Sequence, residues 1–458
     1  SLKDRARLCD DLKSQYKGIE VSEGVNKNLE LLKSENTYTI TTGHQLNIFT
    51  GPMYVIYKIL SAIKLAANLS KKYPENNFIP VYWMASEDHD FEEIKSFHTG
   101  GETYKWDIES KGPVGNLKLE SIESILKEDL DIPDFFVDAY QNSKSLSEAV
   151  RKYMNSLFGK FGLIIIDPNS KNLKSSITDI IEDDIINNSI EKIEKSSDSS
   201  SEVYVRKINF FFQKSDFRER IEKSDTYNIL SSELSFTEEE IKNKIQLSPE
   251  SFSPNVITRC LYQQRILPNI CYVGGPAEII YWTSFKKFFS HYKVPYPVLV
   301  PRDFILLLTT KAQKKIEKLK LSTADLFLDK DKIENKVMSV HTDDSKNFSR
   351  EIIEVKKILE GLSEKFGIED STMKPHVLAT AKNIEKRLLQ IERRYINKQK
   401  ENSKFLIDKV GSLFNFVNPG NSIQERRENI ISFYDSELID NLFQNLDPLD
   451  LNFKILKK

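Results

Sequence analysis

The sequence predicts an α/β protein whose core is a doubly wound, mostly parallel sheet. Three observations indicate this class: short runs that are apolar on both alternations, an amphipathic helix between two of them, and glycines or charged residues directly after the runs. Strands buried on both faces of a parallel sheet lack the polar and apolar alternation of half-exposed strands. Charged helical segments interrupt and follow the sheet, so the chain combines an α/β core with a helical arm.

A first strand–helix–strand unit lies near the start of the core. Alternating β-branched and aromatic residues predict a strand at about 37–42. The following helix has Thr50 as its predicted N-cap and Pro52 in its first turn. A second strand is predicted at 78–85. Parallel strands end at the same edge of a sheet, so the loop at 43–51 should face the loop that follows the second strand.

Further apolar runs extend the sheet. They predict strands at 162–168, 269–276 and 296–304, and a second helix with a proline in its first turn follows the middle one. The core therefore uses residues from roughly 37–170 and 255–310.

The rest of the chain is divided by changes in composition. The predicted organisation is a helical segment at 1–36, the first part of the core at 37–170 with an insertion at about 100–160, a mostly helical connecting insertion at 171–254, the second part of the core at 255–310, a connecting segment at 311–346, a helical hairpin at 347–412, and a terminal segment at 413–458 that returns to the core. In the hairpin, apolar residues step by three and four, which predicts two antiparallel helices with heptad packing. An internal brace and a dimerisation arm explain this pattern equally well.

Composition restricts the classes of function. Lysine and arginine number 66 against 68 aspartates and glutamates, so bulk nucleic-acid binding is not expected. The cysteines Cys9, Cys260 and Cys271 fit neither a disulfide framework nor a cysteine zinc site. No signal-peptide core and no run of about 18 apolar residues occurs, which predicts a cytoplasmic protein without a membrane span. The chain begins with Ser1, so we expect that a leading segment has been trimmed or omitted.

Charged residues follow the second strand directly: Glu87, Asp88, His89 and Asp90. A solvated turn that caps a helix would explain them, since carboxylates favour helix N-termini. Their place at the carboxyl edge of the sheet favours a functional role. The two aspartates would favour the charged form of His89, which suits a general acid or base. A divalent metal site is the alternative, but no motif spacing fixes one.

The loop after the first strand carries more polar groups than a connecting turn needs: Gly43, His44, Gln45, Asn47, Thr50 and Gly51. Gly43 allows close approach of a ligand to the backbone, and the following helix start offers N–H groups to a phosphate or carboxylate. The loop matches neither the dinucleotide-binding nor the Walker pattern. His44 is either a hydrogen-bonded turn residue or a catalytic group.

A second glycine turn ends the strand at 269–276. Gly274 and Gly275 precede a helix with Glu278 in its first turn and Tyr281 and Trp282 behind it. A tight turn with core aromatics and a binding loop are equally consistent with this pattern. Arg302, after the next strand, is the predicted cation for a substrate carboxylate or phosphate.

Four segments together resemble the BshC family, the cysteine ligases of bacillithiol biosynthesis. They are TTGHQLNIFTGPMYVIYKI, VYWMASEDHDFEE, YVGGPAEIIYW followed by VPR, and NPGNSIQERREN, in this order and with matching spacing over essentially the whole chain. Two departures stand out. Many members have Gly-Gln-Gln where this chain has Gly43-His44-Gln45, and members usually carry a leading segment before the first helix.

The resemblance implies a Rossmann-like core with inserted connecting segments and a coiled coil that forms a homodimer. It also implies amide-bond formation between L-cysteine and glucosaminyl-malate, the last step of bacillithiol biosynthesis. The chain has neither H-I-G-H nor K-M-S-K-S, so the use of ATP or another nucleotide is an open inference, and no metal is expected.

This chemistry needs a loop that binds an anion, a group that accepts a proton, and a cation that binds carboxylates. The resemblance and the loops assign these roles to the 43–52 loop, to Asp88, His89 or Asp90, and to Arg302. The alternatives are a non-catalytic Rossmann-like dimer that binds a nucleotide or metabolite for the pathway, and a scaffold that acts through its coiled coil.

Overall fold

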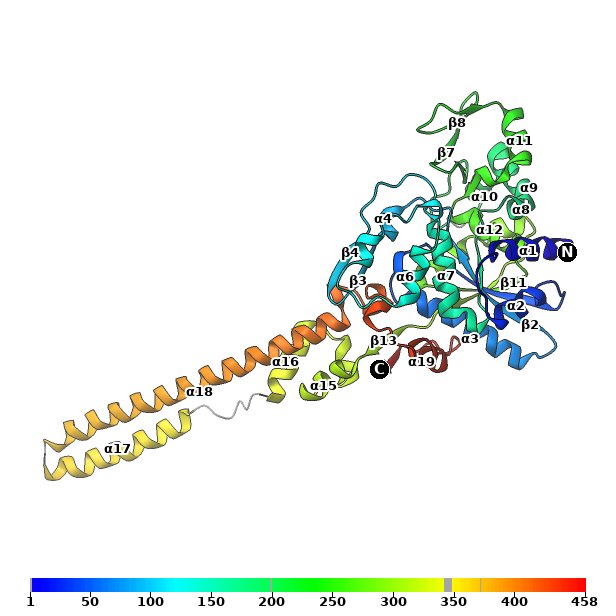
Figure 1. Cartoon of the computed structure of the whole chain (residues 1–458). Helices are drawn as coiled ribbons and strands as arrows, with labels where there is room; N and C mark the ends of the chain where they lie inside the picture. The colour runs from blue at the N-terminus through cyan, green and yellow to red at the C-terminus, as the bar shows by residue number, and fades with distance from the viewer. Residues whose placement is uncertain (1, 198–199, 342–347, 371) are drawn as a thin grey trace. The chain divides into compact units, whose positions relative to one another are not determined.

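The computed structural model describes residues 2–197, 200–341, 348–370 and 372–458 (Figure 1). The chain divides into two compact units. The first contains residues 1–306 and 425–455, and the second contains residues 307–424 and 456–458. The predicted return of the terminal segment to the core therefore begins at 425 rather than at 413.

A five-stranded parallel sheet forms the centre of the first unit. Its order is β12 (Val298–Pro301), β11 (Asn269–Gly274), β1 (Thr37–His44), β2 (Asn77–Met84) and β5 (Ile164–Ile166). Every neighbouring pair is parallel. After β1, the chain adds β2 and β5 on one side of this strand and later adds β11 and β12 on the other side. The order thus reverses between β1 and β11, which confirms the predicted doubly wound sheet.

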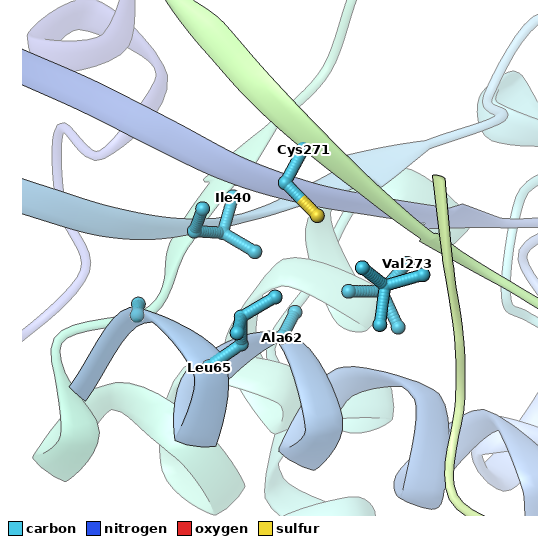
Figure 2. Close-up of a cluster of buried hydrophobic side chains, with 7 residues drawn as sticks. Ile40, Ala62, Leu65, Cys271 and Val273 are labelled. Carbon is cyan, nitrogen blue, oxygen red and sulfur yellow. The ribbon is translucent and has the colours of Figure 1, made fainter. Parts of the chain in front are cut away.

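Helix α3 (Tyr54–Lys72) connects β1 to β2 and packs on the sheet. Figure 2 shows Ala62 and Leu65 of this helix facing Ile40, Cys271 and Val273 of the strands. Burying an aliphatic side chain of this size contributes about 1.5–3 kcal/mol, so this layer anchors the core.

The helix begins later than its sequence predicted. Its N-cap is Met53, and Thr50 lies in the preceding loop with a φ of 70°. The prediction that Thr50 caps the helix is wrong, because the left-handed turn that Thr50 enters cannot lead directly into a helix.

The segments around the first half of the core are mostly helical. They are α1 (Leu2–Gln15), α2 (Glu23–Leu31), α4 (Phe91–Ile94), the antiparallel pair β3 (Ser96–Thr99) and β4 (Glu102–Lys105), α5 (Glu123–Leu126), α6 (Asp134–Gln141) and α7 (Leu146–Phe158).

The connecting insertion holds a second sheet that the sequence did not predict. Its helices are α8 (Lys171–Lys174), α9 (Thr178–Glu182), α10 (Ser189–Ser196) and α11 (Glu238–Leu247). Its antiparallel strands are β6 (Phe210–Gln213), β7 (Arg218–Lys223), β8 (Tyr227–Ile229), β9 (Ser235–Phe236) and β10 (Phe252–Pro254), in the order β10-β6-β7-β8-β9. The prediction of a mostly helical insertion is wrong over 210–254. These strands are short and charged, so their period of two is weak in the sequence.

The remaining helices of the first unit are α12 (Val256–Ile266), α13 (Pro276–Ser284), α14 (Lys286–His291) and α19 (Leu438–Asn445). The helix predicted after the second glycine turn is therefore two helices, α13 and α14. Strands β13 (Ile305–Leu308) and β14 (Lys454–Lys457) form a separate two-stranded sheet.

The second unit is helical and contains the predicted hairpin. Its helices are α15 (Thr310–Lys318), α16 (Lys330–His341), α17 (Ser349–Glu369) and α18 (Met373–Val417). Helices α17 and α18 lie side by side (Figure 1). Lys356 of α17 pairs with Glu385 of α18 at 2.7 Å, and the rings of Phe348 and Tyr395 lie 6.2 Å apart. This register confirms an antiparallel hairpin. In the described part of the chain no helix has an apolar stretch long enough to span a bilayer.

Candidate active site

The point where the strand order reverses defines the candidate site. In open α/β sheets, ligands bind outside the carboxyl ends of the strands at this switch point. Here β1 ends with Gly43 and His44, and β11 ends with Gly274. Because β1, β2, β11 and β12 are all parallel, the three loops that the sequence singled out leave the same edge of the sheet.

An ion pair between a buried lysine and a half-buried glutamate crosses the switch point. Lys58 of α3, whose side chain is 2% exposed, donates from Nζ to the carbonyl oxygen of Gly43 at 2.5 Å and to Glu278 Oε2 at 2.5 Å. Glu278 also accepts from the Tyr272 hydroxyl at 2.8 Å and from the Gly275 N–H at 2.8 Å. Burial opposes ionisation of Glu278, but Lys58 and these donors outweigh it and lower its pKa. Burial also lowers the pKa of Lys58, and Glu278 acts in the opposite direction. The site therefore contains a carboxylate and a lysine amine in fixed positions.

His44 lies beside this pair and faces Tyr54. Its Nε2 is 3.4 Å from the Tyr54 hydroxyl, and the two rings meet edge to face with centroids 5.3 Å apart. Burial, with a smaller contribution from the charge of Lys58, lowers the pKa of His44 to about 3. His44 is thus neutral at physiological pH and is a weak proton acceptor.

Arg259 of α12 brings a second cation to the switch point. Its guanidinium lies 5.8 Å from the Tyr272 ring centroid and 6.0 Å from that of Trp282, and these two rings stack on each other at 4.5 Å. A Cβ at Gly43 would lie 3.4 Å from Arg259 Nη1 and 3.2 Å from the Trp83 Cβ. Gly43 thus lets the strand end and the guanidinium lie close together.

Tyr281 belongs to the same wall of the site. It lies on α13, and burial raises the pKa of its hydroxyl well above the ordinary value. Trp282 is fully buried against Tyr272, as a core aromatic would be, and the assignment of Gly275, Glu278, Tyr281 and Trp282 to substrate binding stays a prediction.

The first two loops face each other as predicted. Gln45 Nε2 donates to Asp88 Oδ2 at 2.8 Å and to Glu93 Oε2 at 2.6 Å. Asn47 Nδ2 donates to the carbonyl oxygen of Glu93 at 3.2 Å. The side chains of the first loop thus hold the acidic loop.

The rest of the first loop is held by the protein itself. Phe49 is buried between the rings of Phe97, Phe136 and Tyr140. Asn429 donates from Nδ2 to the carbonyl oxygens of Phe49 at 2.9 Å and Gly51 at 2.7 Å.

Asn47 and Thr50 are buried, and Gly51 has a φ of 71° with its Cα hydrogens against Asn47. These residues shape the loop, and their assignment as substrate-binding residues stays a prediction.

The acidic loop is a hydrogen-bonded turn. Asp88 Oδ1 accepts from the backbone N–H groups of His89 at 2.8 Å and Asp90 at 3.3 Å. Asp90 Oδ1 accepts from the Glu93 N–H at 3.3 Å and caps α4, so the capping interpretation holds for this residue. The expectation that His89 favours its charged form is wrong. Burial and Arg218 lower its pKa, although Asp88 and Asp90 act in the opposite direction.

Arg302 is occupied by a carboxylate of this chain. Its Nη1 and Nη2 donate to Glu425 Oε2 at 3.0 Å and Oε1 at 2.6 Å, and both residues are almost fully buried. Because this guanidinium already binds a carboxylate of the chain itself, we reassign Arg302 from substrate binding to a structural role at the carboxyl edge of the sheet. Arg426 is exposed and lies within electrostatic range of Tyr54.

A second buried pair supports the acidic loop from the connecting insertion. Lys174 contacts Glu87, and Gln213 of β6 donates to Glu87 Oε1 at 3.1 Å. Sequence reasoning missed this pair, as it missed Lys58, Arg259 and Arg218. Lys58 did carry a signal, because a lysine inside the apolar run of a buried helix needs a partner.

Nothing in the described ranges groups three His, Cys, Asp or Glu side chains as metal ligands require. Cations that could hold the phosphates of a nucleotide do occur, at Arg259 and Arg426. The use of a nucleotide and the expected absence of a metal both stay predictions.

Fold and site together define a Rossmann-like α/β protein with a charged, buried switch point and a helical coiled-coil arm. Comparison with known families adds the particular one. Residues 1–303 match the model of the N-terminal Rossmann-like domain of bacillithiol biosynthesis BshC, and residues 305–458 match its C-terminal coiled-coil domain.

Similar proteins agree over nearly the full length. A relative from Flavobacterium johnsoniae is 38% identical over 99% of this chain and 89% of its own length. Relatives from Cytophaga hutchinsonii and Salinibacter ruber are 37% and 26% identical, over 99% and 96% of this chain and 88% and 86% of their own lengths. Each is named "Putative cysteine ligase BshC". The chain belongs to the BshC family.

Proposed function

We propose that this chain is a ligase that joins the carboxyl group of L-cysteine to the amine of glucosaminyl-malate, the last step of bacillithiol biosynthesis. The names of its relatives support cysteine ligation. One observation of the structure carries the proposal: the Lys58–Glu278 pair sets a buried, charged site at the switch point of the sheet. A non-catalytic sheet edge has little need for such a costly arrangement.

The reaction requires activation before the amide forms. A carboxylate resists attack by an amine, so we propose an acyl adenylate or acyl phosphate made from ATP or another nucleotide. Arg259 and the exposed Arg426 are the cations that would hold the anionic part of this intermediate or the malyl carboxylates. Lys58 and Glu278 tie the ends of β1 and β11 together through Gly43 and Gly275, next to Arg259.

A proton acceptor for the amine comes from the acidic loop. Asp90 caps a helix, and His89 Nδ1 lies 2.8 Å from Arg218. Asp88 is half-buried, and its Oδ2 faces the Gln45 amide across the two loops. We therefore assign proton acceptance to Asp88.

The direct test is product formation from defined substrates. Purified protein is incubated with L-cysteine and glucosaminyl-malate, with and without ATP, and bacillithiol is measured by mass spectrometry. We expect product only in the complete mixture with ATP. Binding of the substrates without product under all nucleotides would favour the non-catalytic binding protein instead.

A matched pair of variants links the activity to the site. Lys58→Met removes the buried amine and leaves Glu278 without its lysine partner. We expect the rate of ligation to fall about a hundredfold or more. Lys160→Met removes a lysine that pairs with Asp440 at 2.6 Å on the surface, and it should change the rate little. Equal rates in the two variants would exclude the switch point as the site.

The partner proposed for this chain is a second copy. The helical hairpin of α17 and α18 would form the contact of a homodimer.

A further inference from the structure

Arg218 reaches the acidic loop from the second sheet. It is buried at the start of β7, and its Nη1 lies 2.8 Å from His89 Nδ1. Its Nε donates to Ser253 Oγ at 2.8 Å, and its Nη2 donates to the carbonyl oxygen of Pro254 at 2.8 Å. The guanidinium also covers the Phe211 ring at 3.9 Å from the centroid. The contacts with Ser253, Pro254 and Phe211 thus hold the guanidinium in the orientation in which Nη1 contacts His89.

The chemistry of the two groups decides where the imidazole proton lies. A guanidinium has donors only and stays protonated in proteins. His89 Nδ1 must therefore accept the hydrogen bond, and the proton of the neutral ring must be on Nε2. Asp88 Oδ1 does not compete, because it is 3.8 Å from Nδ1 and already accepts two backbone N–H groups.

The charges around His89 act on its protonation from two sides. Arg218 disfavours the imidazolium, whereas Asp88, Asp90 and Glu219 favour it. The His89 side chain is 47% exposed, and the partial burial of its ring is the largest influence. Together with Arg218 this burial outweighs the carboxylates, so the pKa falls below 6.5. An imidazolium would also lose the hydrogen bond from Arg218.

We propose that Arg218 is a positioning residue that fixes His89 as a neutral imidazole with its proton on Nε2, so that His89 donates a hydrogen bond during ligation. The role in ligation rests on the proposed function, whereas the protonation state does not. As the amine nitrogen bonds to the activated carbonyl carbon, the C=O electron pair moves to the oxygen. His89 Nε2–H stabilises this oxygen. The electron pair on this oxygen then re-forms the C=O bond, the activating phosphate or nucleoside monophosphate leaves with its bonding pair, and the amine proton passes to Asp88.

The protonation state can be measured without any assay of activity. In ¹⁵N-histidine-labelled protein, two-bond ¹H–¹⁵N spectra distinguish the two neutral tautomers and the charged ring. The chain has six histidines, and His89→Gln identifies the signals of His89 by their loss. We expect the Nε2–H tautomer at pH 7 and a titration midpoint below 6.5. An Nδ1–H tautomer or a charged ring at pH 7 would overturn the proposal, whatever the protein catalyses.

Removal of the guanidinium tests the positioning role. We expect Arg218→Gln to raise the titration midpoint of His89, to mix its tautomers, and to lower kcat at least tenfold with KM changed less than twofold. Arg151→Gln is the matched control, since Arg151 is also buried and donates to Gln15 O at 3.2 Å and Oε1 at 2.8 Å. An unchanged His89 spectrum in Arg218→Gln, or equal kcat losses in both variants, would overturn it.

Two substitutions of His89 separate a donor from a base. In His89→Gln the amide oxygen can accept from Arg218, and the amide NH₂ then takes the place of Nε2–H. We expect His89→Gln to keep at least tenfold more kcat than His89→Ala. Equal loss in the two variants would overturn the donor role, while the spectra of the wild-type protein would still decide the tautomer.

Discussion

Buried ion pairs join distant parts of the chain at the carboxyl edge of the main sheet. Lys58 contacts Glu278, and Arg302 holds Glu425 with two hydrogen bonds. Loss of one partner leaves an unpaired buried charge, which costs about 3–5 kcal/mol. Because desolvation offsets most of the attraction within an intact pair, these pairs add little net stability, and their main effect is to fix the positions of the loops.

His44 offers a prediction at the scale of one residue. Its pKa of about 3 makes it neutral at pH 7, so its contact with the Tyr54 hydroxyl can be kept by an amide. We expect His44→Gln to retain kcat/KM within about threefold, since no proton transfer through this ring is required. A loss as large as that of Lys58→Met in the ligation assay would contradict this and make His44 catalytic.

The same substitution should change how stability depends on pH. Below pH 6.5 the unfolded chain protonates His44, whereas the native state does not until about pH 3. The wild-type protein therefore loses stability from this residue as the pH falls through that window, and His44→Gln does not. The Tm of the variant should rise relative to wild type between pH 7 and pH 4. Parallel Tm curves would contradict a neutral buried His44.

Single residues could be predicted where their signal is local. Gly43 and Gly274 were found because a glycine directly after an apolar run marks the end of a strand. The partner of Lys58 could not be found, because Glu278 lies far along the chain and only the sheet topology brings them together. The charge state expected for His89 was wrong because burial lowers its pKa, as does Arg218, which comes from another sheet.

At the scale of elements, the first loop depends on a segment near the end of the chain. The carbonyl oxygen of Glu428 accepts from the Met53 N–H at 2.8 Å, directly before α3. Asn429 donates to two loop carbonyls, and its Oδ1 accepts from the Ile431 N–H at 3.1 Å. One amide group thus binds both ends of the loop's left-handed turn, which runs from Phe49 to Gly51.

Asn429→Asp tests this dependence with a side chain of the same shape. The NH₂ group becomes an oxygen that faces two carbonyl oxygens, so two hydrogen bonds become repulsive contacts. We expect a loss of about 3 kcal/mol or more in the free energy of unfolding, measured in urea. Asn429→Ala is the control, because it removes the donors without adding charge. Equal or smaller destabilisation by the aspartate would contradict the role of the amide donors.

Helices and strands could be predicted where the hydrophobic periodicity of their sequence is strong. The strands of the main sheet are continuous apolar runs, and each was placed within a few residues of its bounds. The second sheet was missed because a strand such as Arg218–Lys223 presents five charged residues and one buried apolar side chain, Ile221. The apolar contacts of that sheet, such as the one between the Phe212 and Phe252 rings, join different strands and leave no signal in the local sequence.

At the scale of the whole molecule, each family model matches one continuous range of the chain, whereas each compact unit is built from two separate ranges. The models meet between residues 303 and 305, close to the end of the first unit's main segment at 306. Residues 425–455 then return to the first unit and supply Glu425 and Asn429 to the candidate site. The segment matched by the coiled-coil model thus contributes residues to the carboxyl edge of the main sheet, and the sequence reasoning named none of them.

The helical hairpin exposes more apolar surface than its own pairing can bury. The residues predicted to pack between its helices are half-buried at Ile352, Val355 and Leu359, but Leu362 and Phe366 are 38% and 39% exposed. Further apolar side chains are exposed on both helices: Ile353, Ile358, Ile368, Leu378, Leu389 and Ile391. Exposed apolar side chains in this number are a feature of protein interfaces, which favours the dimerisation arm over the internal brace.

A second copy of the hairpin is the partner we propose for this surface, and charge placed there should prevent the contact. Burial of a leucine or phenylalanine side chain contributes about 1.5–3 kcal/mol, so the double variant Leu362→Glu and Phe366→Glu should convert a dimer into a monomer in sedimentation velocity. Lys365→Glu is the control, because Lys365 is an exposed polar position in the same turn. A wild-type protein that sediments as a monomer at all concentrations, or a double variant that stays dimeric, would contradict the proposal. The hairpin would then act within a single chain, where its exposed apolar residues would need another partner.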